Sequence, residues 1–89
     1  NKINIATGAN ASVGTATLSS GTVTVNTTAV TASSVIFLQL NTPSGTLAIA
    51  YAVPVGSIVA STSFVINAVD AAGAVVTTDN STVNYWILN

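Results

Sequence analysis

Two carboxylates are the strongest candidates for chemistry in this 89-residue chain. Asp70 and Asp79 are its only acidic residues, and it has no histidine or cysteine. Two such groups could act as acid and base on a glycosidic bond if they stood about 5 to 9.5 Å apart. Each lies in a predicted turn, at 70–73 and 79–81, where aspartate is favoured because its side chain accepts hydrogen bonds from the local backbone. We therefore interpret both as turn residues and predict no catalytic residue and no enzymatic activity in this chain.

The residue types present in the chain are too few for most other kinds of functional site. A catalytic triad, a cysteine nucleophile and a zinc site all lack parts, and a calcium loop would be short of carboxylates. Lys2 is the only cation, so the chain cannot neutralise nucleic-acid phosphates or an anionic membrane surface. The most apolar window, 46–60, is interrupted by Pro54 and Gly56 and is shorter than the roughly 20 residues of a spanning helix. We expect no metal, no cofactor, no nucleic-acid partner and no membrane insertion.

Aromatic side chains are the remaining candidates for binding. Phe37 and Phe64 stand within predicted strands, and we expect both in the core. Tyr85 and Trp86 are adjacent in a predicted strand, so they must point to opposite faces. An exposed tyrosine or tryptophan can stack on a sugar ring, and both residue types are enriched at protein interfaces. We keep Tyr51, Tyr85 and Trp86 as weak candidates for ligand binding or an interface, with core packing as the alternative.

Short strands must position these side chains. In the opening stretch Val23 and Val25 alternate with Thr22, Thr24 and Asn26, which indicates a strand with one buried face. Residues 13–18 and 21–26 are interpreted as a pair of strands joined by a Ser-Ser-Gly turn. Further strands are expected at 35–40, 46–53, 57–60, 63–69, 74–78 and 83–88. The run 35–40 is nearly all apolar, which is typical of a central strand buried on both faces.

The inward faces of these strands follow from the same alternation. We expect Phe64, Ile66 and Ala68 on one side of their strand, and Val83, Tyr85 and Ile87 on one side of the last. No segment has helical spacing. About seven or eight short strands separated by turns predict an all-β fold, a small antiparallel β-sandwich of jelly-roll or immunoglobulin-like type. We assign residues 1–12 to an N-terminal extended segment or leading strand and 13–89 to the sandwich domain.

The scarcity of charge indicates an oligomer or a part of a larger protein. Lys2, Asp70 and Asp79 are the only charged residues, whereas about a quarter of an average protein is charged. A chain of this size buries only about 60 to 65% of its unfolded surface, and this one has no disulfide to compensate. We infer that identical subunits or further chain cover much of its surface. Because it starts at Asn1 and not at methionine, we expect a fragment or a processed product.

Three blocks of the sequence stand out: the run at 13–38, VGTATLSSGTVTVNTTAVTASSVIFL, the segment TSFVI at 62–66, and STVNYW at 81–86. Together they resemble a recurrent module of bacteriophage structural proteins. The module lies at the C-terminal end of tail-fibre, tailspike or head-fibre proteins, and the resemblance covers residues 13–88. It implies trimeric β-sandwich caps that fold, trimerise or recognise the host surface. Val35 stands where similar modules often carry arginine, so no binding residue is transferred.

These observations lead to one principal expectation and two alternatives. We expect a non-enzymatic virion structural module for trimerisation or host attachment, located in the virion. Its expected partners are copies of itself, a trimer being favoured, other virion proteins and a host-surface glycan. The first alternative is a carbohydrate-binding receptor-recognition domain. The second is a β-domain of a bacterial surface adhesin, which would be extracellular or on the bacterial cell surface.

Overall fold

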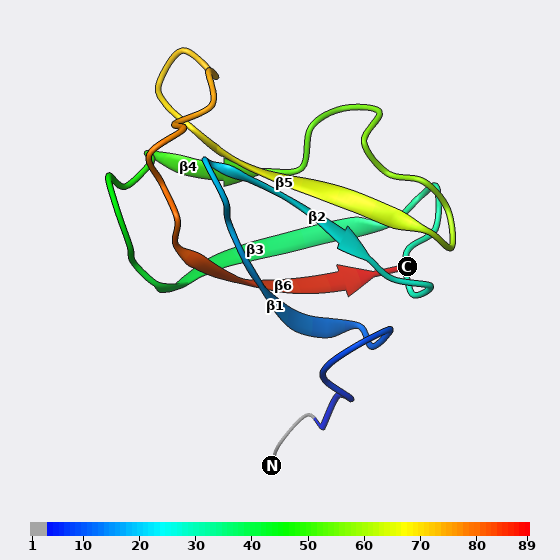
Figure 1. The fold of residues 1–89 in the computed structure, drawn as a ribbon. Coiled ribbons are helices and arrows are strands. Elements are labelled where there is room, and N and C mark those ends of the chain that lie inside the picture. The colour runs from blue at the N-terminus through cyan, green and yellow to red at the C-terminus, as the bar shows by residue number, and fades with distance from the viewer. Residues whose placement is uncertain (1–3) are drawn as a thin grey trace.

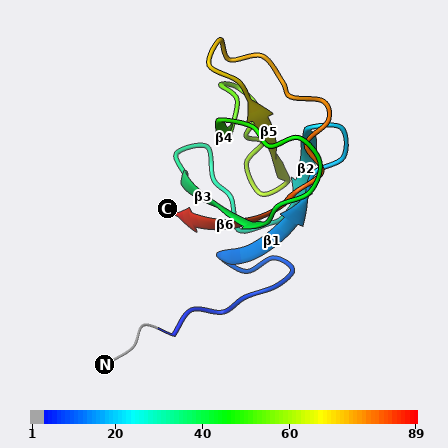
Figure 2. The same cartoon turned by 90° about the vertical axis from the view of Figure 1, so that its left-hand side faces the viewer.

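The computed structural model describes residues 4–89 and confirms a small antiparallel β-sandwich. One sheet has the order β1-β6-β3, formed by Val13–Thr17, Thr82–Leu88 and Val35–Thr42. The other has the order β2-β5-β4, formed by Thr22–Asn26, Ser63–Val69 and Ala50–Ala52. The two sheets lie in separate layers (Figures 1 and 2). Residues 4–89 contain no helix, and hence none that could cross a membrane.

The core lies between the two central strands. β5 contributes Phe64, Ile66 and Ala68, and β6 contributes Val83, Tyr85 and Ile87, all of which are buried. These are the inward faces that alternation predicts for residues 63–69 and 83–88. Val25, Leu18 and Val30 complete the buried cluster from the first third of the chain. The two strands whose alternation is most regular are therefore the two that hold the fold together.

The opening strands form where predicted, but they do not pair with each other. β1 pairs with β6, and β2 pairs with β5. The connection between β1 and β2 passes from one sheet to the other, with Leu18 buried at the crossing and Ser20 and Gly21 at positive φ. The interpretation as a strand pair was wrong because a Ser-Ser-Gly turn fits a change of layer as well as a hairpin.

The apolar run at 35–40 is not a central strand. β3 lies at the edge of its sheet, with β6 as its neighbour in the described chain. Ile36 and Leu38 face the core, whereas Phe37 is 52% exposed and Val35 is also exposed. The expectation that Phe37 lies in the core was therefore wrong, and that for Phe64 is confirmed. A run of apolar residues therefore does not by itself show that both faces of a strand are buried. In β3 the second sheet covers one face, and the described chain leaves the other exposed.

Within residues 4–89, six strands form, whereas the sequence predicts seven or eight. The expected strand 46–53 shortens to β4, and 57–60 and 74–78 make only the single bridges Val59–Ser63 and Val69–Val75. Thr7 makes a single bridge to Val13, and residues 4–12 form no strand. Lys2 and Ile3, within the expected leading segment, lie outside the described residues. In the segment before β4, separate hydrogen bonds take the place of a continuous ladder: the Thr46 N–H donates to Thr78 O, the Ile49 N–H to Val69 O and the Ala48 N–H to the Asp79 carboxylate.

Candidate functional site

Asp70 closes a local turn. Its Oδ1 accepts hydrogen bonds from the N–H groups of Ala72 and Ala74, at 2.9 and 3.0 Å. Its N–H donates to Ala74 O, and its carbonyl accepts from the Gly73 N–H. These contacts are those of an aspartate that nucleates a turn, and they involve only residues within four positions of it.

Asp79 lies in a buried polar corner that joins two long connections. Its Oδ2 accepts hydrogen bonds from the Ala48 N–H at 3.0 Å and from the Tyr51 hydroxyl at 2.8 Å. Its Oδ1 accepts from the Ser81 N–H at 2.9 Å. The Ser81 hydroxyl in turn accepts from the Ser44 N–H at 3.0 Å. The corner thereby fastens the chain before β4 to the chain before β6.

The electrostatics of Asp79 suit a structural anion. Burial tends to raise the pKa of its carboxyl, but interactions with the Ser81 side chain, the Ser81 and Ala48 N–H groups and the Tyr51 hydroxyl outweigh that effect and hold the pKa below its usual value. The side chain is fully buried, and both oxygens already accept hydrogen bonds from the protein. Asp79 therefore has no surface with which to touch a substrate. Among residues 4–89, no group of three or more potential metal-ligating side chains gathers.

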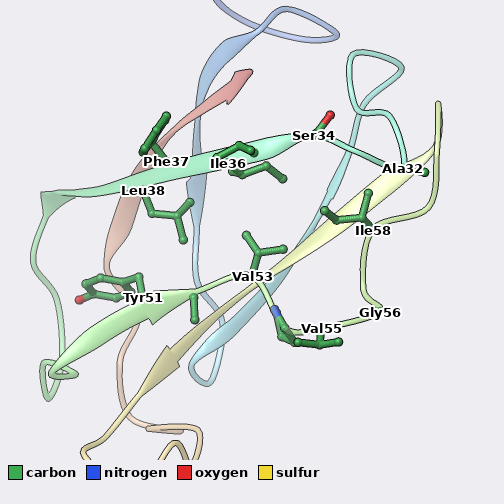
Figure 3. A pocket seen from close by; sticks show the side chains of 13 residues that line it. Ala32, Ser34, Ile36, Phe37, Leu38, Tyr51, Val53, Val55, Gly56 and Ile58 are labelled. Atoms are coloured by element: carbon green, nitrogen blue, oxygen red, sulfur yellow. The ribbon is translucent and has the colours of Figure 1, made fainter. Parts of the chain in front are cut away.

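Tyr51 borders a cleft lined mainly by aliphatic side chains and exposed backbone, which we call the open seam. The seam lies between edge strands β3 and β4 and has a volume of about 610 Å³. Figure 3 shows Ile36 and Leu38 from β3 across from Tyr51 and Val53. We define the open seam as these four residues together with Val55 and Ile58. Because the Tyr51 hydroxyl bonds to Asp79, the polar corner holds one wall of the seam in place.

Tyr85 lies in the core. It is 5% exposed, and its ring meets that of Phe64 edge-on, with centroids 5.4 Å apart and planes at 78°. Burial raises the pKa of its hydroxyl. The ring passes so close to Gly14 that a Cβ there would stand 2.5 Å from the Tyr85 oxygen. A glycine in β1 therefore makes room for this side chain.

Trp86 faces the opposite way, on the outside of the β1-β6-β3 sheet. It is 37% exposed and stands beside Phe37, with ring centroids 6.1 Å apart and planes at 52°. The strand register aligns Val13, Trp86 and Phe37 in one cross-strand row. Val35 and Leu88 form the next row, and both are exposed. An apolar stripe thus crosses the outer face of the sheet.

A polar row follows directly on the same face. The register aligns Thr15, Asn84 and Gln39. Asn84 Nδ2 donates to Gln39 Oε1 at 3.0 Å, and Asn41 Nδ2 donates to Asn84 Oδ1 at 2.7 Å. The two rows line a depression of about 820 Å³. We call it the aromatic groove and define it by Val13, Thr15, Phe37, Gln39, Asn84 and Trp86.

Sequence reasoning placed Phe37 in the core and overlooked the groove's amides. The available signal was the alternation within 35–40, where Phe37 and Gln39 share the side opposite to Ile36 and Leu38. Alternation alone does not tell which side a neighbouring sheet covers. The structure brings Trp86 together with Phe37, whereas Tyr51 and Tyr85 lie at the seam and in the core.

Comparison with protein families matches residues 10–88 to the K1 capsule-specific polysaccharide lyase, C-terminal domain. The chain belongs to this family. The match begins before β1 and ends at the last residue of β6, so the K1 lyase C-terminal domain includes all six strands. It supports, in broad terms, the resemblance to C-terminal modules of phage tail proteins, and it indicates a tailspike-associated domain of a virion-associated protein. Comparisons with curated proteins and with solved structures found no match.

The polar corner and the open seam lie wholly within the residues that match the K1 lyase C-terminal domain. The six residues that define the aromatic groove do so as well. Both surfaces are therefore formed by the domain itself, and of the described residues before residue 10, Ile5 and Thr7 also line the groove.

Proposed function

We propose that this chain is a non-catalytic C-terminal module of a phage tail protein, which assembles as a homotrimer through the open seam and contributes to host attachment. The observation that carries this proposal is the seam, where two edge strands leave apolar side chains that pack against the core only partly buried. The family description supports a C-terminal place beside a capsule-specific polysaccharide lyase. In such a protein the catalytic groups would belong to other parts of the chain.

The state of the two carboxylates supports the absence of catalysis. Asp79 is fully buried with both oxygens occupied, and Asp70 is engaged by the backbone of its own turn. The sequence has no histidine, cysteine or glutamate, so these two are its only side-chain groups with a pKa below those of tyrosine and lysine. Neither is placed to take or give a proton on a bound glycan.

The surface of the chain supports assembly. β3 is eight residues long and carries no charge or proline. Natural edge strands usually carry such features because they prevent pairing with other chains. A partner that covers the seam would bury this edge and the side chains behind it, and the resemblance to trimeric caps favours three copies around one axis.

The seam can be tested without disturbing the fold of the subunit. Val55 belongs to the seam yet is fully exposed, so Val55→Asp removes no contact within the subunit. Burying a valine contributes about 1.5 to 3 kcal/mol, and an interface would also have to desolvate the new charge. We expect association to weaken about tenfold or more. Val75→Asp is the matched control, because Val75 is exposed and lies outside the seam.

The measurement is the mass of the chain in solution, by sedimentation velocity and native mass spectrometry over a range of concentrations. The proposal expects a trimer for the unaltered chain and the Val75→Asp control, and dissociation for Val55→Asp. A soluble monomer of the unaltered chain at high micromolar concentration would refute assembly. A trimer unaffected by Val55→Asp would show that the copies meet elsewhere.

A further inference from the structure

We propose that the aromatic groove is a carbohydrate-binding site, in which one sugar ring lies against Trp86 and Phe37 and its hydroxyl groups meet Asn84 and Gln39. This inference rests on the proposed attachment function, for which it names the class of ligand. It concerns the outer face of the β1-β6-β3 sheet and not the open seam. The proposal for the groove and the proposal for the seam can therefore be tested separately.

The apolar half of the groove offers what the C–H face of a sugar requires. Trp86 and Phe37 belong to different strands, but their rings meet at a tilt of 52° and both remain exposed. Aromatic faces of this kind carry partial negative charge, which favours contact with the polarised C–H groups of a sugar. Tryptophan also loses little conformational freedom on binding, since it has only two side-chain torsions.

The polar half lies at a distance that suits a sugar ring. Asn84 and Trp86 are two residues apart on one strand, as are Gln39 and Phe37, so the two rows stand about 7 Å apart. A ring seated on the aromatic pair would therefore extend its hydroxyl groups to the amides. The chain of hydrogen bonds from Asn41 through Asn84 to Gln39 fixes the direction of these amides. The Gln39 Nε2 group makes no hydrogen bond within residues 4–89 and can donate to a hydroxyl.

The absence of charge decides which ligand the groove fits. None of the described residues that line it is charged, so the groove offers hydroxyl and amide groups and apolar faces only. A sugar presents the complementary set, whereas a phosphorylated or strongly basic ligand would lose its hydration without a counter-charge. The groove volume of about 820 Å³ lies within the usual range for ligand sites, about 300 to 1,000 Å³. A second copy of the chain would bury the polar row against apolar side chains unless its own amides faced it.

Trp86 makes the proposal directly measurable, because it is the only tryptophan in the chain. The probes are a printed array of bacterial capsule oligosaccharides that includes neutral ones, and oligosaccharides prepared from K1 capsular polysaccharide, the glycan that the family description names; in every case the groove is expected to take an uncharged sugar residue. Binding is followed by the array and by the fluorescence of Trp86. We expect a fluorescence change that saturates with the bound oligosaccharide and an affinity that stays within about twofold between low and high salt, since no ion pair contributes.

Three variants test the contacts. We expect Trp86→Ala and Phe37→Ala each to weaken binding about tenfold or more, read from the array or by calorimetry because the first variant removes the fluorophore. Gln39→Ala should weaken it less but measurably. Val59→Ala is the control, since Val59 is about as exposed as Phe37 and lies outside the groove. Circular dichroism establishes whether each variant is folded. If Trp86→Ala is unfolded, Phe37→Ala tests the aromatic contact in its place.

The outcomes separate this inference from assembly. Binding that survives Val55→Asp but is lost with Trp86→Ala supports the groove, whatever the oligomeric state. No binding to any glycan by a chain that still forms trimers overturns the groove and leaves assembly standing. Binding unaffected by either aromatic substitution also overturns it. Loss of the oligomer with Trp86→Ala, without any glycan bound, would mean that the groove is an interface between copies.

Discussion

The polar corner around Asp79 makes the sharpest prediction about stability. Replacing Asp79 with asparagine keeps the shape of the side chain but turns one acceptor oxygen into an NH2 donor. Oδ2 accepts from Ala48 and Tyr51, and Oδ1 accepts from Ser81. Whichever way the asparagine amide is turned, its NH2 group faces a backbone N–H that has lost its acceptor.

The magnitude follows from these contacts. A polar group left without a partner in the protein costs about 1 to 3 kcal/mol. The hydrogen bonds that remain change from a charged to a neutral acceptor, and neutral ones are roughly half as strong. Relief from burying a charge offsets part of this loss, so we expect Asp79→Asn to lower the free energy of unfolding by about 2 to 4 kcal/mol. The total free energy of unfolding of a chain of this length is about 4 to 13 kcal/mol, so the variant loses a large share of its stability.

The assay is urea unfolding at a single protein concentration, with thermal melting as a second measure. The expected loss corresponds to a fall in melting temperature of about 10 to 25 °C. Asp70→Asn is the matched control, because asparagine retains the Oδ1 that accepts from Ala72 and Ala74, and we expect a change below about 0.5 kcal/mol. Equal unfolding midpoints for the two variants would refute the view that Asp79 fastens the connections.

Two further predictions follow from pH and from the glycines. The folded-state pKa of Asp79 is held below its unfolded value of about 3.9, so its contribution to stability is fully present above that pH and is lost as the pH falls through the folded-state pKa. Urea titrations between pH 6 and pH 2.5 should show a steeper fall for the unaltered chain than for Asp79→Asn, and parallel curves would contradict this. Gly73→Ala should cost about 1 to 2 kcal/mol, since Gly73 has a φ of 84° but open space around it. Gly21→Ala should cost at least about 2 kcal/mol more, because a Cβ there would stand 2.3 Å from the Val76 oxygen; similar melting temperatures for the two variants would contradict this.

Sequence patterns predicted those parts of the fold that depend on alternation within one strand. β5 and β6 form at the expected residues, and their inward faces are as expected. The pairing of β1 and the position of β3 in its sheet could not be read in this way, because both depend on which distant strand lies alongside. β6 pairs with both of them, so it takes the central position that the apolar run 35–40 suggested for β3.

The same limit applies to the candidate surfaces. The sequence indicates that Asp79 lies in a turn, but its partners Ala48 and Tyr51 stand about thirty positions away and reach it only in the folded chain. Trp86 could be predicted to face away from Tyr85, whereas its contact with Phe37 depends on the register between β3 and β6. The turn at Asp79 and the direction of Trp86 were predictable from neighbouring residues, whereas contacts between residues of separate strands were not.

β3 connects the two proposed activities of this domain. Its alternate residues serve different surfaces: Ile36 and Leu38 line the seam, while Phe37 and Gln39 line the groove. A substitution that disturbed the backbone of β3 would affect both surfaces, so binding by Phe37→Ala and Gln39→Ala is compared with the oligomeric state of the same variants. Val55 and Trp86 lie outside β3, one on each surface, which is why their variants can be compared. A strand without charge or proline at the edge of a sheet is a liability in a soluble monomer, and it becomes useful when one side packs against other copies and the other side meets a ligand.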